Sequence, residues 1–405
     1  MSEARSATLR RVLAADACAG CGLCAGVAPG AIQMDGADGW LRPRVVGPVA
    51  PEAEAAIAAA CPALDLEIEA AGRPDHVLWG PIVEARIGHA TDPELRRHAS
   101  SGGGLSALLV HLLETGAVDY VLQTAASDAD PLGNMTVTSL DRTGVFRAAG
   151  SRYAPSAPLA DIEEALARDA KFAFVGKPCD VAALRALARV DPRVDARVPA
   201  MLSFFCAGVP NRQGAVKVVQ KLGFREDEVT AFRFRGDGWP GQARATGPGG
   251  ETRGMSYADS WGGILSAHVQ FRCKICPDGT GGFADVVCAD AWETDAAGYP
   301  LFEEAEGESM ILARTEAGAA LARAAEAAGR IEARPFDVAD IAAMQPAQLR
   351  RRPAALARSL AMPFAGRPMP RHRGFHLAAA ARQGGLKSNL RNFLGTLRRL
   401  IWPKR

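Results

Sequence analysis

The residues that say most about the fold are KFAFVGKPCD, residues 171–180. Its apolar run predicts a buried strand over 171–175, and the glycine and proline that follow predict a loop over 176–180. A helix to about residue 189 comes next. Residues 199–205 repeat the arrangement, with a strand that ends at Cys206, a loop, and a helix from about residue 213. Two consecutive strand–loop–helix units favour a partly parallel sheet, which gathers ligands at the carboxyl ends of its strands.

The chain on either side extends this pattern. Leucines recur at helical spacing over 103–116, and a strand is expected over 118–124. Further strands are expected over 229–235, 284–287 and 310–313, with a helix over 316–328 and a Gly- and Pro-rich loop or hairpin over 236–254. The predicted fold class is therefore α/β (α+β) with a mixed sheet.

Composition bounds the kind of protein. The chain has 405 residues, 48% hydrophobic and 23% charged, which suits a globular protein of two or three domains. No run of 18 apolar residues occurs, and the first residues do not resemble a secretory signal. We therefore expect a cytoplasmic protein in a reducing compartment, where its nine cysteines would not form disulfides.

Charge is distributed unevenly along the chain. The last acidic residue is Asp340, and residues 341–405 hold 14 Lys and Arg, which leaves 33 basic against 45 acidic residues before them. We expect four regions: a cysteine-rich segment (1–72), two parts of an α/β body (80–165 and 166–340), and a basic helical tail (341–405). The first segment has little apolar sequence and is expected to fold around a bound group.

The sequence CAGCGLC, residues 18–24, indicates an iron–sulfur cluster. Three thiolates at this spacing can reach three corners of a cubane 4Fe–4S cluster, and ferredoxins add a fourth cysteine followed by proline. That position is Ala28 here, so we expect Cys61, which precedes Pro62, to supply the fourth ligand. The alternatives are a zinc site or free thiols. The predicted ligands are Cys18, Cys21, Cys24 and Cys61.

A second group of cysteines could hold a second cluster. Cys179 and Cys206 follow predicted strands, and Cys273 and Cys276 form a CxxC motif. Four thiolates would suffice for another cubane; the alternative is two core cysteines and an unrelated CxxC. Cys288 lies inside a strand-like run and is expected to be a small core residue.

The segment Ser100-Ser101-Gly102-Gly103-Gly104 opens the predicted helix over 103–116. Glycines allow close backbone approach, and amides at the start of a helix attract phosphate, so this segment could cradle the diphosphate of a flavin nucleotide. The alternative is a capped helix after a flexible turn. On the first interpretation, Gly102→Val should release flavin while the protein still folds.

Seven motifs in this order resemble the coenzyme F(420) hydrogenase/dehydrogenase beta-subunit family, to which 7-hydroxymethyl chlorophyll a reductase is similar. The resemblance covers roughly residues 15–340. The motifs are CAGCGLC (18–24), ASSGG (99–103), GSRYAPS (150–156), VGKPCD (175–180), FFCAG (204–208), CKICPD (273–278) and ADVVCADAW (284–292).

The resemblance implies an FAD-dependent iron–sulfur oxidoreductase with a ferredoxin-like N-terminal segment and a flavin-binding body. It implies two 4Fe–4S clusters on the two cysteine groups, and Lys177 as a cation near the flavin or its phosphate. The family usually has Gly-Asp where this chain has Ala289-Asp290, and the chlorophyll reductases space their first cluster differently, so no chlorophyll substrate is carried over. The implied flavin contacts are Ser100, Ser101, Gly102, Gly103, Ser151, Gly176, Lys177 and Asp290.

Three classes of function remain open. The chain could be a self-contained reductase acting on a substrate, a deazaflavin or a ferredoxin-type carrier. It could instead be an electron-transfer subunit of a larger hydrogenase or dehydrogenase, and the third class is a zinc-stabilised binding protein. No catalytic residue is assigned, because no pairing is visible for the histidines; those considered are His76, His89, His98, His111 and His268.

The basic tail predicts an amphipathic helix over 389–402, with arginines beside a row of leucines. Such a helix could contact an anionic membrane at the inner face or bind an acidic electron-donor protein such as ferredoxin. The alternative is a helix packed on its own domain. Nucleic acid is not expected as a partner, because the body is acidic.

Overall fold

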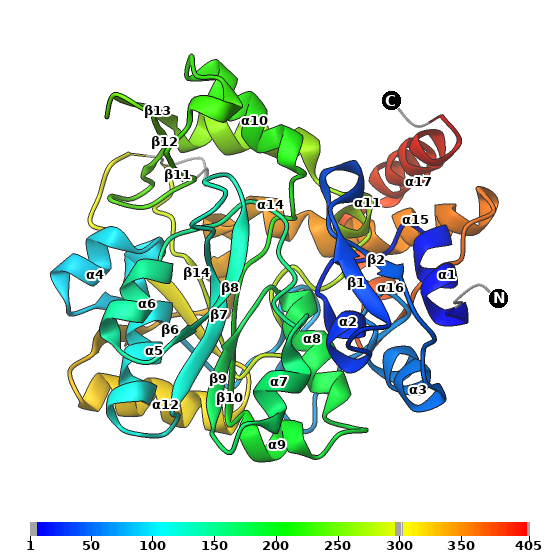
Figure 1. Ribbon diagram of the computed structural model, residues 1–405, viewed down its shortest axis with the longest axis horizontal. Coiled ribbons are helices and arrows are strands. Elements are labelled where there is room, and N and C mark those ends of the chain that lie inside the picture. Colours follow the sequence, from blue (N-terminus) through cyan, green and yellow to red (C-terminus); the bar gives the residue numbers. More distant parts are fainter. Residues whose placement is uncertain (1–5, 296–300, 302, 403–405) are drawn as a thin grey trace.

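The computed structural model describes residues 6–295, 301 and 303–402. Its centre is an eight-stranded mixed sheet of order β16-β6-β15-β14-β10-β9-β7-β8 (Figure 1). Strands β7, β9, β10 and β14 are parallel neighbours, while β15 is antiparallel to both β14 and β6. The strands are β6 (Glu84–Ala90), β7 (Tyr120–Ala126), β8 (Asn134–Ser139), β9 (Phe172–Val175), β10 (Ala200–Phe204), β14 (Val286–Asp290), β15 (Ser309–Ala313) and β16 (Ile331–Pro335).

Helices cover both faces of this sheet, because successive side chains of each buried strand point to opposite faces. Phe172 and Phe174 of β9 face a core with α7 (Ile162–Ala167), α8 (Pro178–Leu187) and α9 (Arg193–Arg197). Ala173 and Val175 face a second core on the other side. The helices on that side are α4 (Pro93–His98), α5 (Gly104–Glu114), α6 (Arg142–Ala148) and α12 (Glu316–Ala327).

A smaller unit follows β10. Helix α10 (Arg212–Lys221) packs on an antiparallel sheet of β11 (Ala231–Arg233), β12 (Gln242–Thr246) and β13 (Thr252–Ser256). The Gly- and Pro-rich stretch 236–254 thus contributes a hairpin, as one of its two interpretations allowed. Helix α11 (Phe271–Lys274) then leads back to β14.

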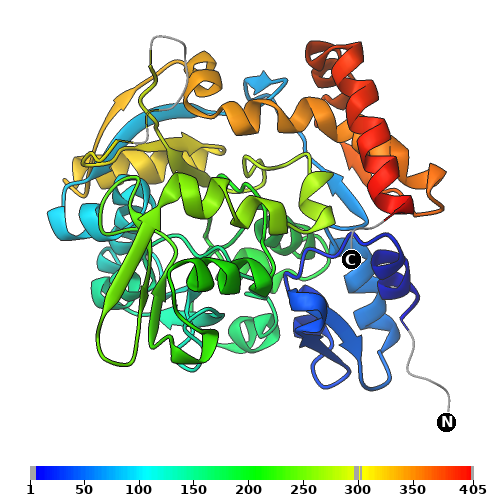
Figure 2. The same cartoon turned by 90° about the horizontal axis from the view of Figure 1, so that it is seen from above.

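The N-terminal segment and the C-terminal tail lie side by side at one end of the molecule, as both views show (Figures 1 and 2). The segment contains α1 (Ala7–Ala14), α2 (Leu23–Val27), a β1–β2 hairpin (Ile32–Asp35, Arg42–Val45), α3 (Pro51–Ala60) and β3 (Asp65–Glu67). Strand β3 pairs in parallel with β17 (Arg371–Arg373) of the tail. A short pair, β4 (Asp75–His76) and β5 (Gly80–Pro81), leads into the body.

The tail is folded against the rest of the chain along much of its length. Its helices are α13 (Ile341–Met344), α14 (Pro346–Leu349), α15 (Arg351–Phe364), α16 (Leu377–Gly384) and α17 (Leu386–Ile401). Ile341 and Ala380 belong to the main core, and Met362 and Leu400 pack near Cys18. Among the described residues, no helix is both long and apolar enough to cross a membrane.

Most predicted elements are present, with one correction that concerns the site. The loop expected over 176–180 is shorter, because α8 already begins at Pro178. Proline suits the first turn of a helix, and Asp180 accepts a hydrogen bond from the Lys177 amide at 2.9 Å, which caps that turn. Cys179 therefore lies on a helix rather than on a loop.

Candidate functional site

The first cysteine group lies around a tight turn between α1 and α2. Gly20 and Gly22 both have left-handed backbone angles, with φ of 75° and 86°. A Cβ on Gly22 would lie 2.7 Å from the amide nitrogen of Ala160, so this position also needs glycine to pack against the body. Cys24 is carried by α2, and Cys61 ends α3.

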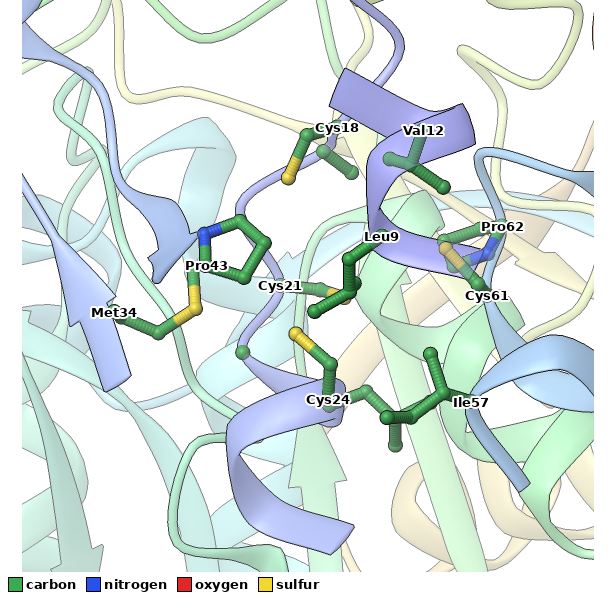
Figure 3. A pocket seen from close by; sticks show the side chains of 13 residues that line it. Leu9, Val12, Cys18, Cys21, Cys24, Met34, Pro43, Ile57, Cys61 and Pro62 are labelled. Atoms are coloured by element: carbon green, nitrogen blue, oxygen red, sulfur yellow. The ribbon is translucent and has the colours of Figure 1, made fainter. Parts of the chain in front are cut away.

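Four cysteines line one otherwise apolar cavity (Figure 3). They are the predicted ligands Cys18, Cys21, Cys24 and Cys61, from segments up to 43 residues apart in sequence. Burial raises the pKa of all four thiols, and neighbouring cysteines of the group raise the pKa of Cys21 and Cys24 further. The other side chains around the cavity include Leu9, Val12, Met34, Pro43, Ile57 and Pro62.

This donor set fits a cubane cluster by its chemistry. Its cysteine side chains share a cavity lined with apolar residues, and thiolates are the usual ligands of such clusters. Each would bind a different iron, so the thiols need not converge on one point. Among the described residues, no group of three or more His, Cys, Asp or Glu could hold a single metal ion.

The second cysteine group gathers at the carboxyl edge of the main sheet. Cys179 lies in the first turn of α8, Cys206 follows β10, and Cys273 and Cys276 lie on and after α11. Burial raises the pKa of Cys179, which the charges of Cys206 and Cys273 raise further. Burial likewise raises the pKa of Cys206 to about 12, with Cys273 and Cys276 adding to the shift. Cys179 thus interacts electrostatically with Cys206 and Cys273, and Cys206 with Cys273 and Cys276.

Amide hydrogens point at one sulfur of each group. The Gly20 amide donates to Cys18 Sγ at 3.4 Å, and the Val209 amide donates to Cys273 Sγ at 3.4 Å. Such N–H···S contacts stabilise negative charge on the sulfur and are one way a protein adjusts a cluster.

Cys288 is not part of either group. It is buried on β14 among apolar residues, and burial raises its pKa to about 12. The prediction that it is a small core residue is confirmed.

Side chains of the C-terminal tail donate hydrogen bonds to the backbone around the second cysteine group. Arg351 donates to the carbonyl oxygens of Cys206 at 2.6 Å and Cys273 at 2.7 Å, and Gln348 donates to that of Cys206 at 3.0 Å. Arg358 donates to the Lys274 carbonyl at 2.9 Å. The sequence did not suggest these contacts, because arginines in a basic tail look like solvent-exposed residues.

The serine–glycine turn lies where α5 begins. Ser101, Gly102 and Gly103 all have left-handed φ angles, of 56°, 65° and 75°. The Gly104 amide donates to Ser309 Oγ at 3.2 Å and the Gly103 amide to the Ser100 carbonyl at 3.3 Å, so these two amides are already paired within the protein.

The expectation that Gly102→Val would leave folding intact conflicts with the packing at this position. A Cβ at Gly102 would lie 2.6 Å from the Gly307 carbonyl oxygen. Glycine is favoured at position 102 because the backbone of a neighbouring segment leaves little space for a side chain, independently of any ligand.

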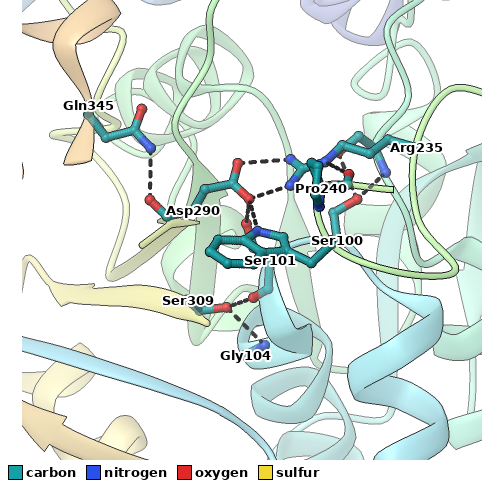
Figure 4. A network of polar contacts seen from close by, with 10 residues as sticks. Ser100, Ser101, Gly104, Arg235, Pro240, Asp290, Ser309 and Gln345 are labelled. Carbon is teal, nitrogen blue, oxygen red and sulfur yellow. Dashed lines mark hydrogen bonds and ion pairs between the residues drawn. The ribbon is translucent and has the colours of Figure 1, made fainter. Parts of the chain in front are cut away.

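Asp290 joins this turn to the rest of the sheet edge (Figure 4). Ser101 Oγ donates to it at 2.6 Å, Trp239 Nε1 at 2.8 Å, and Arg235 through two nitrogens at 2.5 and 2.8 Å. Burial alone would raise the pKa of Asp290, but Arg235 and these hydrogen bonds lower it, so the carboxylate stays charged. Gln345 of the tail donates to the Asp290 carbonyl at 2.8 Å.

Aromatic rings surround this ion pair. Trp239 stacks on Trp292 with ring centroids 4.6 Å apart, and the Arg235 guanidinium lies 4.9 Å from the Tyr257 ring centroid and 5.0 Å from that of Trp292. Of these residues only Trp292 lay in a motif that the sequence singled out. These rings pack around the Arg235–Asp290 ion pair and help to bury it.

The other predicted flavin contacts lie in two regions of the structure. Ser151 joins the turn, since its amide donates to Ser100 Oγ at 2.9 Å. Gly176 and Lys177 follow β9 instead. Lys177 is 7% exposed, so it is not an exposed loop lysine, and its Nζ lies 2.8 Å from Asp180 and 2.7 Å from Ser156 Oγ. Burial lowers the pKa of Lys177, but the Asp180 carboxylate raises it overall.

His98 has a close carboxylate partner that the sequence did not reveal. His98 Nδ1 lies 2.8 Å from Asp237 Oδ1, and its ring stacks on Phe146. Burial is the main cause that lowers the pKa of His98, with the charge of Arg233 adding to it.

Comparison with known proteins identifies the family. Residues 86–163 match the N-terminal part, and residues 169–339 the C-terminal part, of the family described as coenzyme F420 hydrogenase/dehydrogenase, beta subunit. The coenzyme F420 hydrogenase subunit beta of Methanococcus voltae is 28% identical over 265 residues, which is 64% of this chain and 86% of that protein. The subunit of the same name from Methanosarcina barkeri is 25% identical over 273 residues, 64% of this chain and 84% of that protein.

The fold agrees with this assignment. A chain in a solved structure of the F420-reducing [NiFe] hydrogenase complex from Methanosarcina barkeri superposes with a TM-score of 0.51 at 22% identity, covering 65% of this chain and 85% of that one. The motifs, the two family matches and the shared fold lead to one conclusion: this chain belongs to the coenzyme F420 hydrogenase/dehydrogenase beta-subunit family.

Proposed function

We propose that this protein is an iron–sulfur flavoprotein oxidoreductase that passes electrons between two 4Fe–4S clusters, FAD and a substrate or carrier. The observation that carries the proposal is the grouping of eight cysteines into two sets of four, one of which lines a single cavity. The names of the relatives, subunits of coenzyme F420 hydrogenases, support oxidoreductase chemistry.

Different residues of this chain would bind each of the three cofactors. Cys18, Cys21, Cys24 and Cys61 would hold one cluster, and Cys179, Cys206, Cys273 and Cys276 the other. The turn at Ser100 to Gly103, Ser151, Asp290, Gly176 and Lys177 would line the flavin site, with Arg235 fixing the charge of Asp290. A flavin, when bound, exchanges electrons singly or in pairs, which suits it to connect clusters with a two-electron substrate.

We further propose that electrons reach or leave the chain through a partner protein. The relatives' names describe beta subunits, which favours a partner dehydrogenase or hydrogenase subunit; a ferredoxin-type donor is the alternative. A self-contained reductase would need neither a partner subunit nor a ferredoxin-type donor. Isolation of the native protein with or without a bound larger subunit separates these possibilities.

Peripheral membrane contact through α17 is a second proposal for the tail, favoured by one observation. Leu386, Leu390 and Leu394 of this helix are exposed and four residues apart, beside Lys387 and Arg391. Apolar and basic side chains arranged in this way suit an anionic lipid surface.

The central experiment is anaerobic reconstitution followed by measurement of iron, sulfide and released flavin. We expect about eight irons per chain, four for each cubane, and one FAD. Cys179→Ser should lower the iron content to about half. Cys288→Ala, which removes a thiol outside both groups, is the matched control and should leave it unchanged. About four irons in the wild type, unaffected by Cys179→Ser, would reject the second cluster, and no bound flavin would reject the flavin assignment.

A further inference from the structure

Arg272 lies between the two cysteine groups. It is 2% exposed and precedes Cys273 on α11. Its Nη2 donates to the carbonyl oxygen of Pro62 at 2.9 Å, directly after Cys61 of the first group. One side chain thus connects two cysteine-bearing segments that are more than 200 residues apart in sequence.

The rest of its guanidinium has no protein acceptor. Nε and Nη1 of Arg272 are buried, and neither has a hydrogen-bond partner among the described residues. Buried Arg314 is better satisfied, since its Nη1 and Nη2 donate to the carbonyl oxygens of Trp79, Pro81 and Thr280 and only its Nε lacks a partner among the described residues. Leaving two buried guanidinium N–H groups unpaired is unfavourable, so such groups require an explanation.

Cysteines of both groups act on the charge of Arg272. Burial lowers the pKa of Arg272, but the thiolate charges of Cys276, Cys179, Cys273 and Cys61 together raise it. Arg272 also interacts electrostatically with Asp278 and with the buried side chain of His372. Both cysteine groups therefore share this one cation.

We infer that Arg272 is a positioning residue common to both 4Fe–4S clusters: its free N–H groups donate to cluster or cysteine sulfurs, and its charge raises both reduction potentials. Reduction makes a cluster more negative, so a nearby buried cation favours the reduced form. The inference rests on the proposed function, because it requires that both clusters bind.

The test measures the potentials of both clusters by EPR-monitored redox titration of reconstituted protein. In Arg272→Met, which keeps an unbranched apolar side chain but removes the charge and the donors, both midpoint potentials should shift to more negative values. Arg272→Lys keeps the charge, so its potentials should lie closer to those of the wild type. Arg314→Met is the matched control, because it removes a buried cation that pairs with backbone carbonyls; it should leave both potentials unchanged.

Each outcome is decisive. Unchanged potentials in Arg272→Met at full iron content, or an equal shift in Arg314→Met, would overturn the inference. If Arg272→Met retains too little iron to titrate, Arg272→Lys decides: full iron with potentials near the wild type supports the charge role, whereas equal loss of iron makes Arg272 a packing residue. Wild-type protein that binds fewer than two clusters would instead reject the proposed function.

Discussion

At the residue scale, glycine at position 102 illustrates how one residue type can serve two purposes. Glycine in a Ser-Ser-Gly-Gly turn suggests a phosphate cradle, because it lets the backbone approach a ligand. The structure adds a reason internal to the protein, since the missing side chain makes room for the backbone of Gly307 and Glu308. A substitution there therefore tests the fold before it tests any ligand.

Gly102→Ala should destabilise the protein more than Gly329→Ala. Both glycines have similar left-handed φ angles, 65° and 67°, but a Cβ at Gly329 would meet nothing within 4 Å. The backbone penalty of about 1–2 kcal/mol applies to both, and crowding should add about 1–3 kcal/mol at Gly102 alone. Urea unfolding of the two variants measures the difference. Equal losses of stability would show that the 307–308 segment moves aside freely.

At the element scale, the apolar residues of α17 have different surroundings along the helix. Leu400 packs in a core with Cys18, Ile275 and Met362, and Phe393 contacts Phe364 of α15 with ring centroids 5.4 Å apart. Leu386, at the start of the same helix, is 85% exposed. The tail thus has features of both interpretations. Part of α17 packs on its own domain, and another part presents exposed apolar side chains beside basic ones.

Point variants separate these two roles better than deletion of residues 385–405, which would also uncover α15. We expect full-length protein to sediment with anionic vesicles at low salt and to be released at high salt. Leu390→Glu combined with Leu394→Glu should abolish this binding and leave the cluster and flavin spectra unchanged. Leu400→Ala, the control in the packed part of the helix, should cost about 2–5 kcal/mol of stability but still bind. Absence of binding by the full-length protein would reject the membrane contact.

At the scale of the whole molecule, the N-terminal segment is more closely joined to the body than its composition suggests. Cys21 and Leu23 belong to the same core as Phe172 of the main sheet, and β3 pairs with β17 of the tail. The two ends of the chain therefore enclose the cysteine groups together.

Removal of iron should loosen both ends of the chain at once. Chelation of the reconstituted protein is expected to increase hydrogen exchange in α1–α3 and in α15–α17, because residues from both regions pack around Cys18. Exchange in β7 and β9, at the centre of the sheet, should change little. Hydrogen exchange with mass spectrometry compares the two forms, and faster exchange in the N-terminal segment alone would show that the tail is stable without a cluster.

The sequence by itself determined the local features of this protein. A continuous apolar run predicted β9, helical spacing predicted α5, and alanine-rich composition predicted α12, because all three are properties of adjacent residues. Cysteine spacing grouped Cys18, Cys21 and Cys24, and strand ends placed Cys179 and Cys206 at one edge, because parallel strands share the direction of their carboxyl ends. The family resemblance added Ser101 and Asp290, whose side chains do meet.

Only the tertiary structure decided which distant residues meet. Arg235 and Trp239 reach Asp290 from a segment more than 50 residues away, and Arg272 reaches Pro62 across more than 200. Arg351 belongs to a tail whose composition resembles that of a solvated surface, yet it holds the loops of the second cysteine group. Such contacts depend on how helices and strands pack in three dimensions, and no pattern among neighbouring residues encodes that packing.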